Sequence, residues 1–259
     1  MSRIESGQVH IDVASLTWYL GILRVPYEVA VPLISLCRQA RDHRGYWMAD
    51  HGDRIPDAFS SLLYHEATAD SSISYEPLLI PGFLQTQRYA RRVISRNPTL
   101  TKSEVDLGVE IRIGRQRLVN ERDRRFCFYI HEQALRTMVG DNDIMCEQLL
   151  ALALVGGAPN VIVRVVRTPI GESPSLAGSF RIFEFEEYDP LVYLGSVVAS
   201  FWIEDRAFVE PYGRLANHLA EISESVEESR SFIAALADEY DRGSIPHATD
   251  RVEEEHLQR

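Results

Sequence analysis

The sequence contains few cysteines and no long apolar run. Its three cysteines, Cys37, Cys127 and Cys146, are widely spaced and form no Cys-x-x-Cys pair. This pattern is typical of reduced thiols in a cytoplasmic protein and argues against a disulfide framework. The longest apolar run, 149–155, is too short to cross a bilayer, and the opening residues lack the apolar core of a signal peptide. We therefore expect a cytoplasmic protein without a membrane span.

The signatures of common catalytic sites are also missing. The sequence has no nucleophile elbow, phosphate-binding loop, Gly-x-Gly-x-x-Gly fingerprint or His-Glu-x-x-His motif. Cys127 and His131 would share one face of a strand, but no second pair at a usable spacing completes a zinc site. We expect neither enzyme activity nor a bound cofactor or metal ion.

The charge balance makes the chain as a whole a poor binder of nucleic acid. The 259 residues carry a formal net charge of −11, and Lys102 is the only lysine. Such a surface repels phosphate groups, so any contact with DNA needs a local basic element.

Hydrophobic periodicity divides the chain into three segments. Residues 1–45 read as helical, with Asp12 as a helix cap and Pro26 as a helix stop. Tyr46-Trp47 and the polar residues 50–54 read as a linker. We expect a larger domain over 46–240 and, because few apolar residues come after it, a disordered tail over 241–259.

The larger domain alternates between helical and extended patterns. Thr101-x-x-Glu104 and Ser225-x-x-Glu228 are capping boxes that open two helices. Alternating apolar residues predict strands at 125–131 and 160–167, and then an antiparallel meander at 179–185, 191–194 and 200–203. The fold class is therefore α+β, with helices packed on an antiparallel sheet.

A basic stripe occupies the predicted helix that begins at Thr101. Arg112, Arg115 and Arg117 follow one another on this helix beside Glu110. We interpret the stripe as a solvated face with local ion pairs, with binding of an anion or acidic partner as the alternative.

The N-terminal residues Ser2-Arg3-Ile4-Glu5-Ser6-Gly7 resemble the end of the recognition helix in Xre/Cro-type helix-turn-helix proteins. The resemblance implies DNA contacts by Ser2, Arg3 and Ser6, because that helix lies in the major groove. It also implies that two further helices of the DNA-binding head precede this position, so that the head is truncated here and DNA binding by this chain is weak or absent.

A second resemblance covers most of residues 47–240. The string Tyr75-Glu-Pro-Leu-Leu-Ile-Pro-Gly-Phe-Leu-Gln-Thr86, followed by Tyr89-Ala90, is similar to the large C-terminal domain of unknown function behind Xre heads in actinobacterial regulators, some of them antitoxin-like. That domain usually has an acidic residue where this chain has Gly195. Our candidates for binding a ligand or a partner are Tyr75, Glu76, Gln85, Glu132, Arg136 and Tyr193.

The resemblance implies a transcription regulator whose head binds DNA as a homodimer. Its C-terminal domain would sense a small molecule or a small partner protein. Two alternatives stay open. The chain could be an antitoxin-like interaction module that no longer binds DNA, and the string at 75–86 could be a structural crossing segment in which Leu78, Leu79 and Phe83 pack inward.

Overall fold

The computed structural model describes residues 11–41, 45–50, 55–168, 178–196 and 199–243. Within it the chain forms two compact units, 1–46 and 47–259. The predicted DNA-contacting residues Ser2, Arg3 and Ser6 lie outside the described residues, as do residues 244–259 of the predicted tail.

Two helices make up the described part of the first unit: α1 (Val13–Ile22) and α2 (Tyr27–Arg41). The predicted cap is confirmed, since Asp12 Oδ1 accepts a hydrogen bond from the Ser15 backbone at 3.0 Å. Helix α1 contains no charged residue, yet Trp18 and Tyr19 are more than half exposed. A helix that is apolar on most sides is normally covered by other elements.

A seven-stranded sheet organises the described part of the second unit, in the order β1-β7-β6-β5-β2-β3-β4. Its strands are β1 (Tyr46–Asp50), β2 (Ser71–Glu76), β3 (Arg125–His131), β4 (Val161–Val166), β5 (Phe180–Glu184), β6 (Leu191–Gly195) and β7 (Ala199–Ile203). The expected antiparallel meander β5-β6-β7 is confirmed, and β5 also pairs antiparallel with β2. Strands β2, β3 and β4 pair in parallel, so the sheet is mixed rather than antiparallel throughout.

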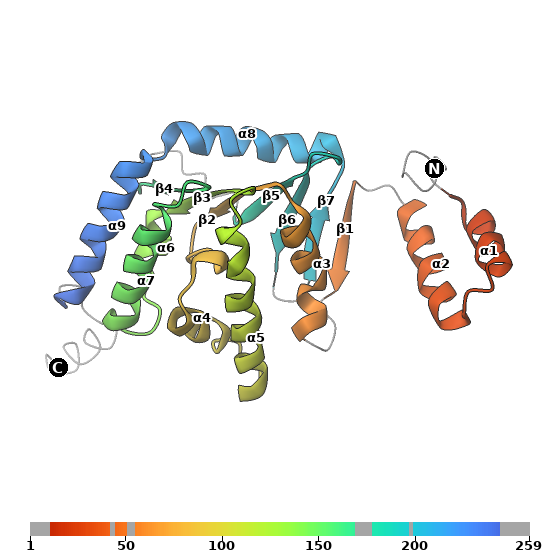
Figure 1. The fold of residues 1–259 in the computed structure, drawn as a ribbon, viewed down its shortest axis with the longest axis horizontal. Helices are drawn as coiled ribbons and strands as arrows, with labels where there is room; N and C mark the ends of the chain where they lie inside the picture. Colours follow the sequence, from red (N-terminus) through yellow and green to blue (C-terminus); the bar gives the residue numbers. More distant parts are fainter. Residues whose placement is uncertain (1–10, 42–44, 51–54, 169–177, 197–198, 244–259) are drawn as a thin grey trace, which may run out of the picture. The chain divides into compact units, whose positions relative to one another are not determined.

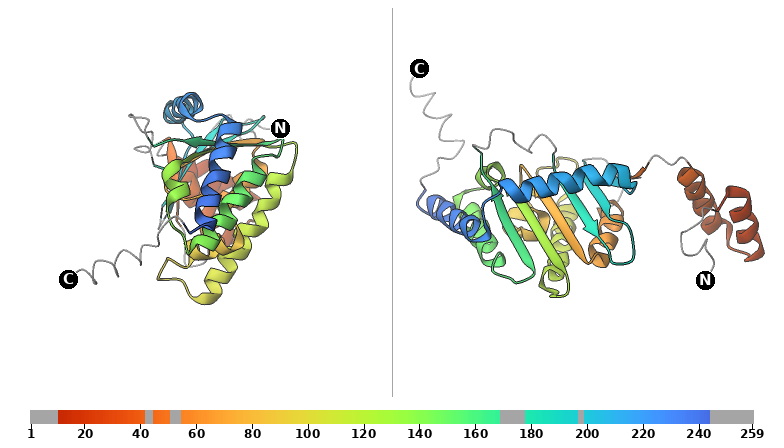
Figure 2. Two further views of the ribbon diagram at one scale, coloured as in Figure 1. Left: turned by 90° about the vertical axis from the view of Figure 1, so that its left-hand side faces the viewer. Right: turned by 90° about the horizontal axis from the view of Figure 1, so that it is seen from above.

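Helices cover both faces of this sheet, in agreement with the expected α+β class. They are α3 (Ile55–Thr68), α4 (Gln87–Ile94), α5 (Lys102–Gly114), α6 (Glu132–Arg136), α7 (Asn142–Val155), α8 (Arg206–Ile222) and α9 (Val226–Asp241), with two 3₁₀ segments, η1 (Gly82–Leu84) and η2 (Arg115–Asn120). Helix α8 runs across one face, and the others pack against the opposite face or its edge (Figure 1, Figure 2).

Strand alternation assigns each face its own core. On the face under α8, Tyr75, Phe180 and Val192 are buried against Leu219. The opposite face is apolar at its β3–β4 end, where α7 and α9 pack on Phe128. At its β5–β7 end, α3 covers a smaller aromatic core around Trp202. Polar side chains occupy the space between these two apolar ends.

Two strands depart from the sequence-based prediction. The segment interpreted as a linker begins with strand β1, which lies beside β7 at the edge of the sheet. Strand β2 was not predicted, because Ser71, Ser72 and Ser74 make it read as polar, although all three serines are buried. The sheet therefore extends further toward the N-terminus of the chain than apolar alternation indicates.

Adjacent leucines of α7 test this packing. Leu149 is fully buried in the core under the β3–β4 end, whereas Leu150 is 47% exposed. We expect Leu149→Ala to lower the free energy of unfolding by about 2–5 kcal/mol, because it leaves a cavity. Leu150→Ala should change it by no more than about 0.5 kcal/mol. Urea unfolding followed by circular dichroism measures both, and equal effects would contradict this placement of α7.

Candidate functional site

A row of polar and aromatic side chains crosses the sheet on the face opposite α8. Ser74 of β2 pairs with Arg181 of β5, which pairs with Tyr193 of β6, which pairs with Trp202 of β7. Directly paired residues point to the same side of a sheet, so the four side chains form one continuous row. An arginine inside such a row needs a charged partner from the helices that cover it.

Glu66 of α3 is that partner. Its carboxylate is fully buried and accepts hydrogen bonds from Nη1 of Arg181 at 2.5 Å and from Nη1 of Arg115 at 3.0 Å. Arg181 Nε also donates to Ser74 Oγ at 2.9 Å. One carboxylate therefore joins helix α3 to strand β5 and to segment η2, and burial lowers the pKa of Arg115 despite Glu66.

Glu76 and Arg112 lie next to this ion pair. Burial raises the pKa of Glu76 to about 7, against the opposing influence of Arg181 and Arg112. Burial likewise lowers the pKa of Arg112 to about 10, with the nearby Arg115 adding to the effect. We call Glu66, Glu76, Arg112, Arg115 and Arg181 the charge cluster. Three guanidinium groups thus face two carboxylates, one of which titrates near neutral pH.

The segment Pro81–Thr86 wraps the charge cluster. A Cβ at Gly82 would lie 2.7 Å from Nη2 of Arg115, so glycine lets the backbone approach the guanidinium. The Phe83 ring lies 5.3 Å from the Arg115 guanidinium carbon and 5.0 Å from that of Arg181. Phe83 therefore covers both cations with an aromatic face.

Gln85 holds this segment in place through hydrogen bonds of its side chain and of its backbone carbonyl. Its Oε1 accepts from Arg112 Nη1 at 2.7 Å, and its Nε2 donates to the Ile80 carbonyl at 2.8 Å. Gln116 donates to the Gln85 carbonyl at 2.6 Å. Buried Gln148 of α7 holds the end of the segment by bonding the Leu84 carbonyl and the Thr86 amide, both at 2.7 Å.

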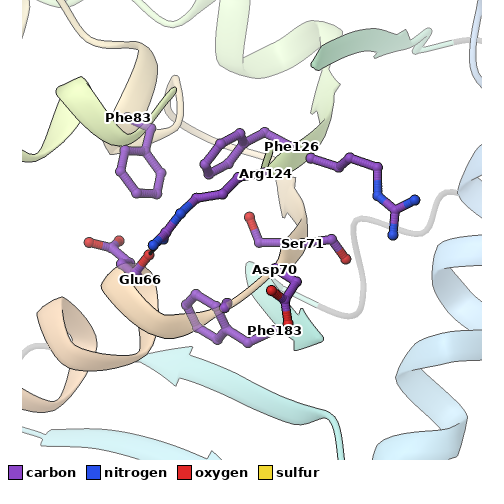
Figure 3. A pocket seen from close by; sticks show the side chains of 10 residues that line it. Glu66, Asp70, Ser71, Phe83, Arg124, Phe126 and Phe183 are labelled. Atoms are coloured by element: carbon purple, nitrogen blue, oxygen red, sulfur yellow. Dashed lines mark hydrogen bonds between the residues drawn. The ribbon is translucent and has the colours of Figure 1, made fainter. Parts of the chain in front are cut away.

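Tight packing leaves little free space beside the cluster. Figure 3 shows Glu66 and Arg124 between Phe83, Phe126 and Phe183, and the gap there has essentially no room for a water molecule. Arg124 Nη1 donates to the Glu66 carbonyl at 2.8 Å. The cluster is therefore an interior network and not an open cavity at this point.

An aromatic cluster continues from the charge cluster toward the sheet edge. Tyr193 of β6 pairs with Arg181 of β5 in the sheet, and its ring centroid lies 4.9 Å from that of Trp202. His65 of α3 lies 4.3 Å from Trp202, and Trp47 of β1 stacks on it at 5.4 Å with an interplanar angle of 14°. These contacts connect the charge cluster to strand β1.

The structure brings together three of the six predicted binding residues. Glu76, Gln85 and Tyr193 all surround Arg112, which none of them neighbours in sequence. Tyr75 points to the opposite face, where burial raises its pKa to about 12 and its ring lies 5.9 Å from Phe180.

Glu132 and Arg136 form a separate network at the end of β3. Glu132 accepts from Arg136 Nε at 2.7 Å and from Arg167 Nε at 3.1 Å, so its carboxylate is held by two arginines. Burial raises the pKa of Glu132, but hydrogen bonds from Arg136, Thr168 and Arg167 outweigh this and lower it to about 2. Arg167 also packs 4.0 Å from the Phe232 ring. The pair thus ties the ends of β3 and β4 to α9.

Several residues of the cluster were misread or missed in the sequence. The interpretation of Arg112 and Arg115 as a solvated face was wrong: Arg115 is 9% exposed, and only Arg117 of the stripe is exposed. The sequence did not indicate that Arg181 belongs to the site, because it is a single charged residue within an otherwise apolar strand pattern. Of the crossing segment, Phe83 is buried and Leu79 packs on the core, but Leu78 is 64% exposed.

The site combines charged groups with a phenol. It offers guanidinium groups, carboxylates and one phenol, and Arg115 Nε is buried with no hydrogen-bond partner among the described residues. Within the described ranges, no three histidine, cysteine or acidic side chains gather as metal ligands would. In the same part of the chain, no helix has the length and apolar character to cross a membrane.

Comparison with known proteins gives one family match. A family model described as "Domain of unknown function (DUF5753)" matches residues 59–235. A search of curated proteins finds no match. Among solved structures, the archaeal chromatin protein TrmBL2, whose report describes a novel mode of DNA binding, is similar with 11% identity and a TM-score of 0.35. The match covers 79% of this chain and 64% of that one, and a TM-score this low does not establish a shared fold.

Neutralising Glu66 tests the charge cluster. We expect Glu66→Gln to lower the free energy of unfolding by about 3–5 kcal/mol, because it removes the carboxylate that forms direct ion pairs with buried Arg115 and Arg181. Glu210→Gln, which breaks an exposed pair with Arg214, should cost less than about 1 kcal/mol. The two variants differ from the wild type by the same chemical change, and equal unfolding midpoints would contradict the described network.

The contribution of Glu76 to the free energy of unfolding should depend on pH in the opposite direction to that of an ordinary surface carboxylate. Its pKa is raised from 4.5 to about 7 in the folded chain, so its contribution to stability is complete below 4.5 and is lost as pH rises through 7. The difference in unfolding free energy between wild type and Glu76→Gln should change by at most about 1.4 kcal/mol per pH unit within this window. Urea titrations at several pH values measure it, and a flat difference would refute the raised pKa.

Proposed function

The chain belongs to the DUF5753 family, and we propose that it is a transcription regulator of the actinobacterial Xre type. In this proposal an N-terminal head binds an operator as a homodimer, and residues 46–240 bind a small ligand or a partner protein and shift that binding. The resemblance of residues 2–7 to a recognition helix supports the first part. The charge cluster serves binding, without a catalytic step.

The observation that carries the proposal is the contact series from the charge cluster to strand β1. Tyr193, the strand partner of Arg181, packs on Trp202, and Trp202 stacks on Trp47. Trp47 belongs to an edge strand that is the next element after helix α2 in sequence. A change in the cluster that alters the Trp202 packing therefore acts on the segment that leads to the head, which is what a sensor domain requires.

The chemistry of the charge cluster favours an anionic effector group. A carboxylate or phosphate would compete with Glu66 or Glu76 for the three arginines, whose geometry suits such groups. Because the space beside Glu66 and Phe83 is closed, entry of this group would displace part of the segment 81–86. Binding would then be coupled to a structural change rather than fill a preformed cavity.

A second candidate function is an antitoxin-like interaction module without DNA binding. It is favoured by α1, which has no charged residue to contact phosphates and exposes Trp18, Tyr19 and Ile22, followed by exposed Leu23 at its C-terminal cap. Exposed apolar side chains grouped on one element are typical of protein interaction sites.

A DNA-binding assay separates the two candidates. We expect the protein expressed with any in-frame codons upstream of Met1 to bind fragments from its own promoter region, with affinity that falls as salt rises, because the contacts are to phosphates. The 259-residue chain should bind the same fragments more weakly. Fluorescence anisotropy on labelled fragments measures both proteins.

Arg3→Ala in the longer protein provides the control, since its loss should weaken binding without changing the fold. If neither protein binds any promoter-proximal fragment, the regulator proposal fails and the interaction module takes its place.

A further inference from the structure

A groove with a basic rim lies on the surface between α4, the start of α5 and the start of α7. Its volume is about 620 Å³, and its lining residues are Arg88, Arg91, Arg92, Ser95, Leu100, Lys102, Val105 and Ile144. We call this the basic groove. Four of the eight lining residues are cationic and none is acidic, although the chain as a whole carries a net charge of −11.

Two of the cations already have carboxylate partners at the rim. Arg88 pairs with Glu147 at 2.9 Å and Arg91 pairs with Asp106, and all four side chains are at least 40% exposed. Exposed pairs of this kind contribute little stability and exchange partners readily. Arg92 and Lys102 are exposed and have no ion pair among the described residues.

The floor of the basic groove is apolar. Val105 and Ile144 are buried, and Leu100 is half-buried. A nucleic-acid backbone would use the rim but would gain nothing from three aliphatic side chains. A protein segment with both carboxylates and an apolar anchor matches the rim and the floor together.

We propose that the basic groove binds a short acidic segment of a partner protein, with an aliphatic side chain seated over Leu100, Val105 and Ile144. This inference deepens the partner-binding half of the proposed function and rests on it. It does not depend on DNA binding, so the promoter assay can fail while this inference holds.

A peptide-binding experiment tests the inference on the full chain. The probe is a fluorescein-labelled peptide of about 15 residues with leucines at helical spacing and glutamates elsewhere. We expect saturable binding that weakens as salt increases. Arg92→Glu combined with Lys102→Glu should weaken it by about tenfold or more, since both charges are reversed in the groove.

The matched control is Arg206→Glu combined with Arg214→Glu. Both residues are exposed on α8, which lies on the opposite face of the sheet, and the change in net charge is the same. This variant should bind like the wild type. A peptide in which serine replaces every leucine should bind at least about tenfold more weakly to the wild type, because the floor loses its partner.

Three outcomes would overturn the inference. One is equal weakening by the two double variants, which would mean a response to net charge alone. Another is equal binding of a single-stranded DNA of the same charge, which would assign the groove to nucleic acid. The last is absence of peptide binding, and if the groove variant then also changes its oligomeric state, the groove belongs to a second copy of this chain.

Discussion

Burial of the Glu66 carboxylate between Arg115 and Arg181 is the constraint on which the architecture of the second unit depends. A dehydrated carboxylate is tolerated only with its countercharges in place, so α3, η2 and β5 must come together in one arrangement. Gly82 and Phe83 match that arrangement, since one makes room for the Arg115 guanidinium and the other covers both cations. The Pro-Gly-Phe-Leu-Gln-Thr string therefore covers the buried charged side chains.

Local signals in the sequence predicted their elements correctly. The capping boxes at Thr101 and Ser225 both form, with Glu104 and Glu228 bonding back to the cap, because all the interacting groups lie within four residues. The three strands of the meander were found because apolar alternation and short connections are also local. Asp12 caps α1 for the same reason.

Long-range pairing explains what the sequence did not reveal. Ser74 and Ser71 of β2 are satisfied by Arg181 and Glu184, more than a hundred positions away, so their burial cannot be read from their neighbours. Arg115 resembles any solvated helix arginine until Glu66 is placed opposite it. Glu76, Gln85 and Tyr193 were predicted individually. The antiparallel pairing of β2 with β5 and of β5 with β6 brings Glu76 and Tyr193 together, and Gln85 reaches Arg112 from the segment after η1.

Helix α5 connects the basic groove with the charge cluster. Its first turns carry Lys102 and Val105 of the groove, and its last turn carries Arg112, which binds Gln85. A helix transmits displacement along its axis because its backbone hydrogen bonds resist local deformation. We propose that a partner that moves the first turn also changes the Arg112–Gln85 contact and, through Tyr193 and Trp202, the stacking of Trp47. In this proposal, occupation of the groove and rearrangement of the cluster are two ways of acting on the same edge strand.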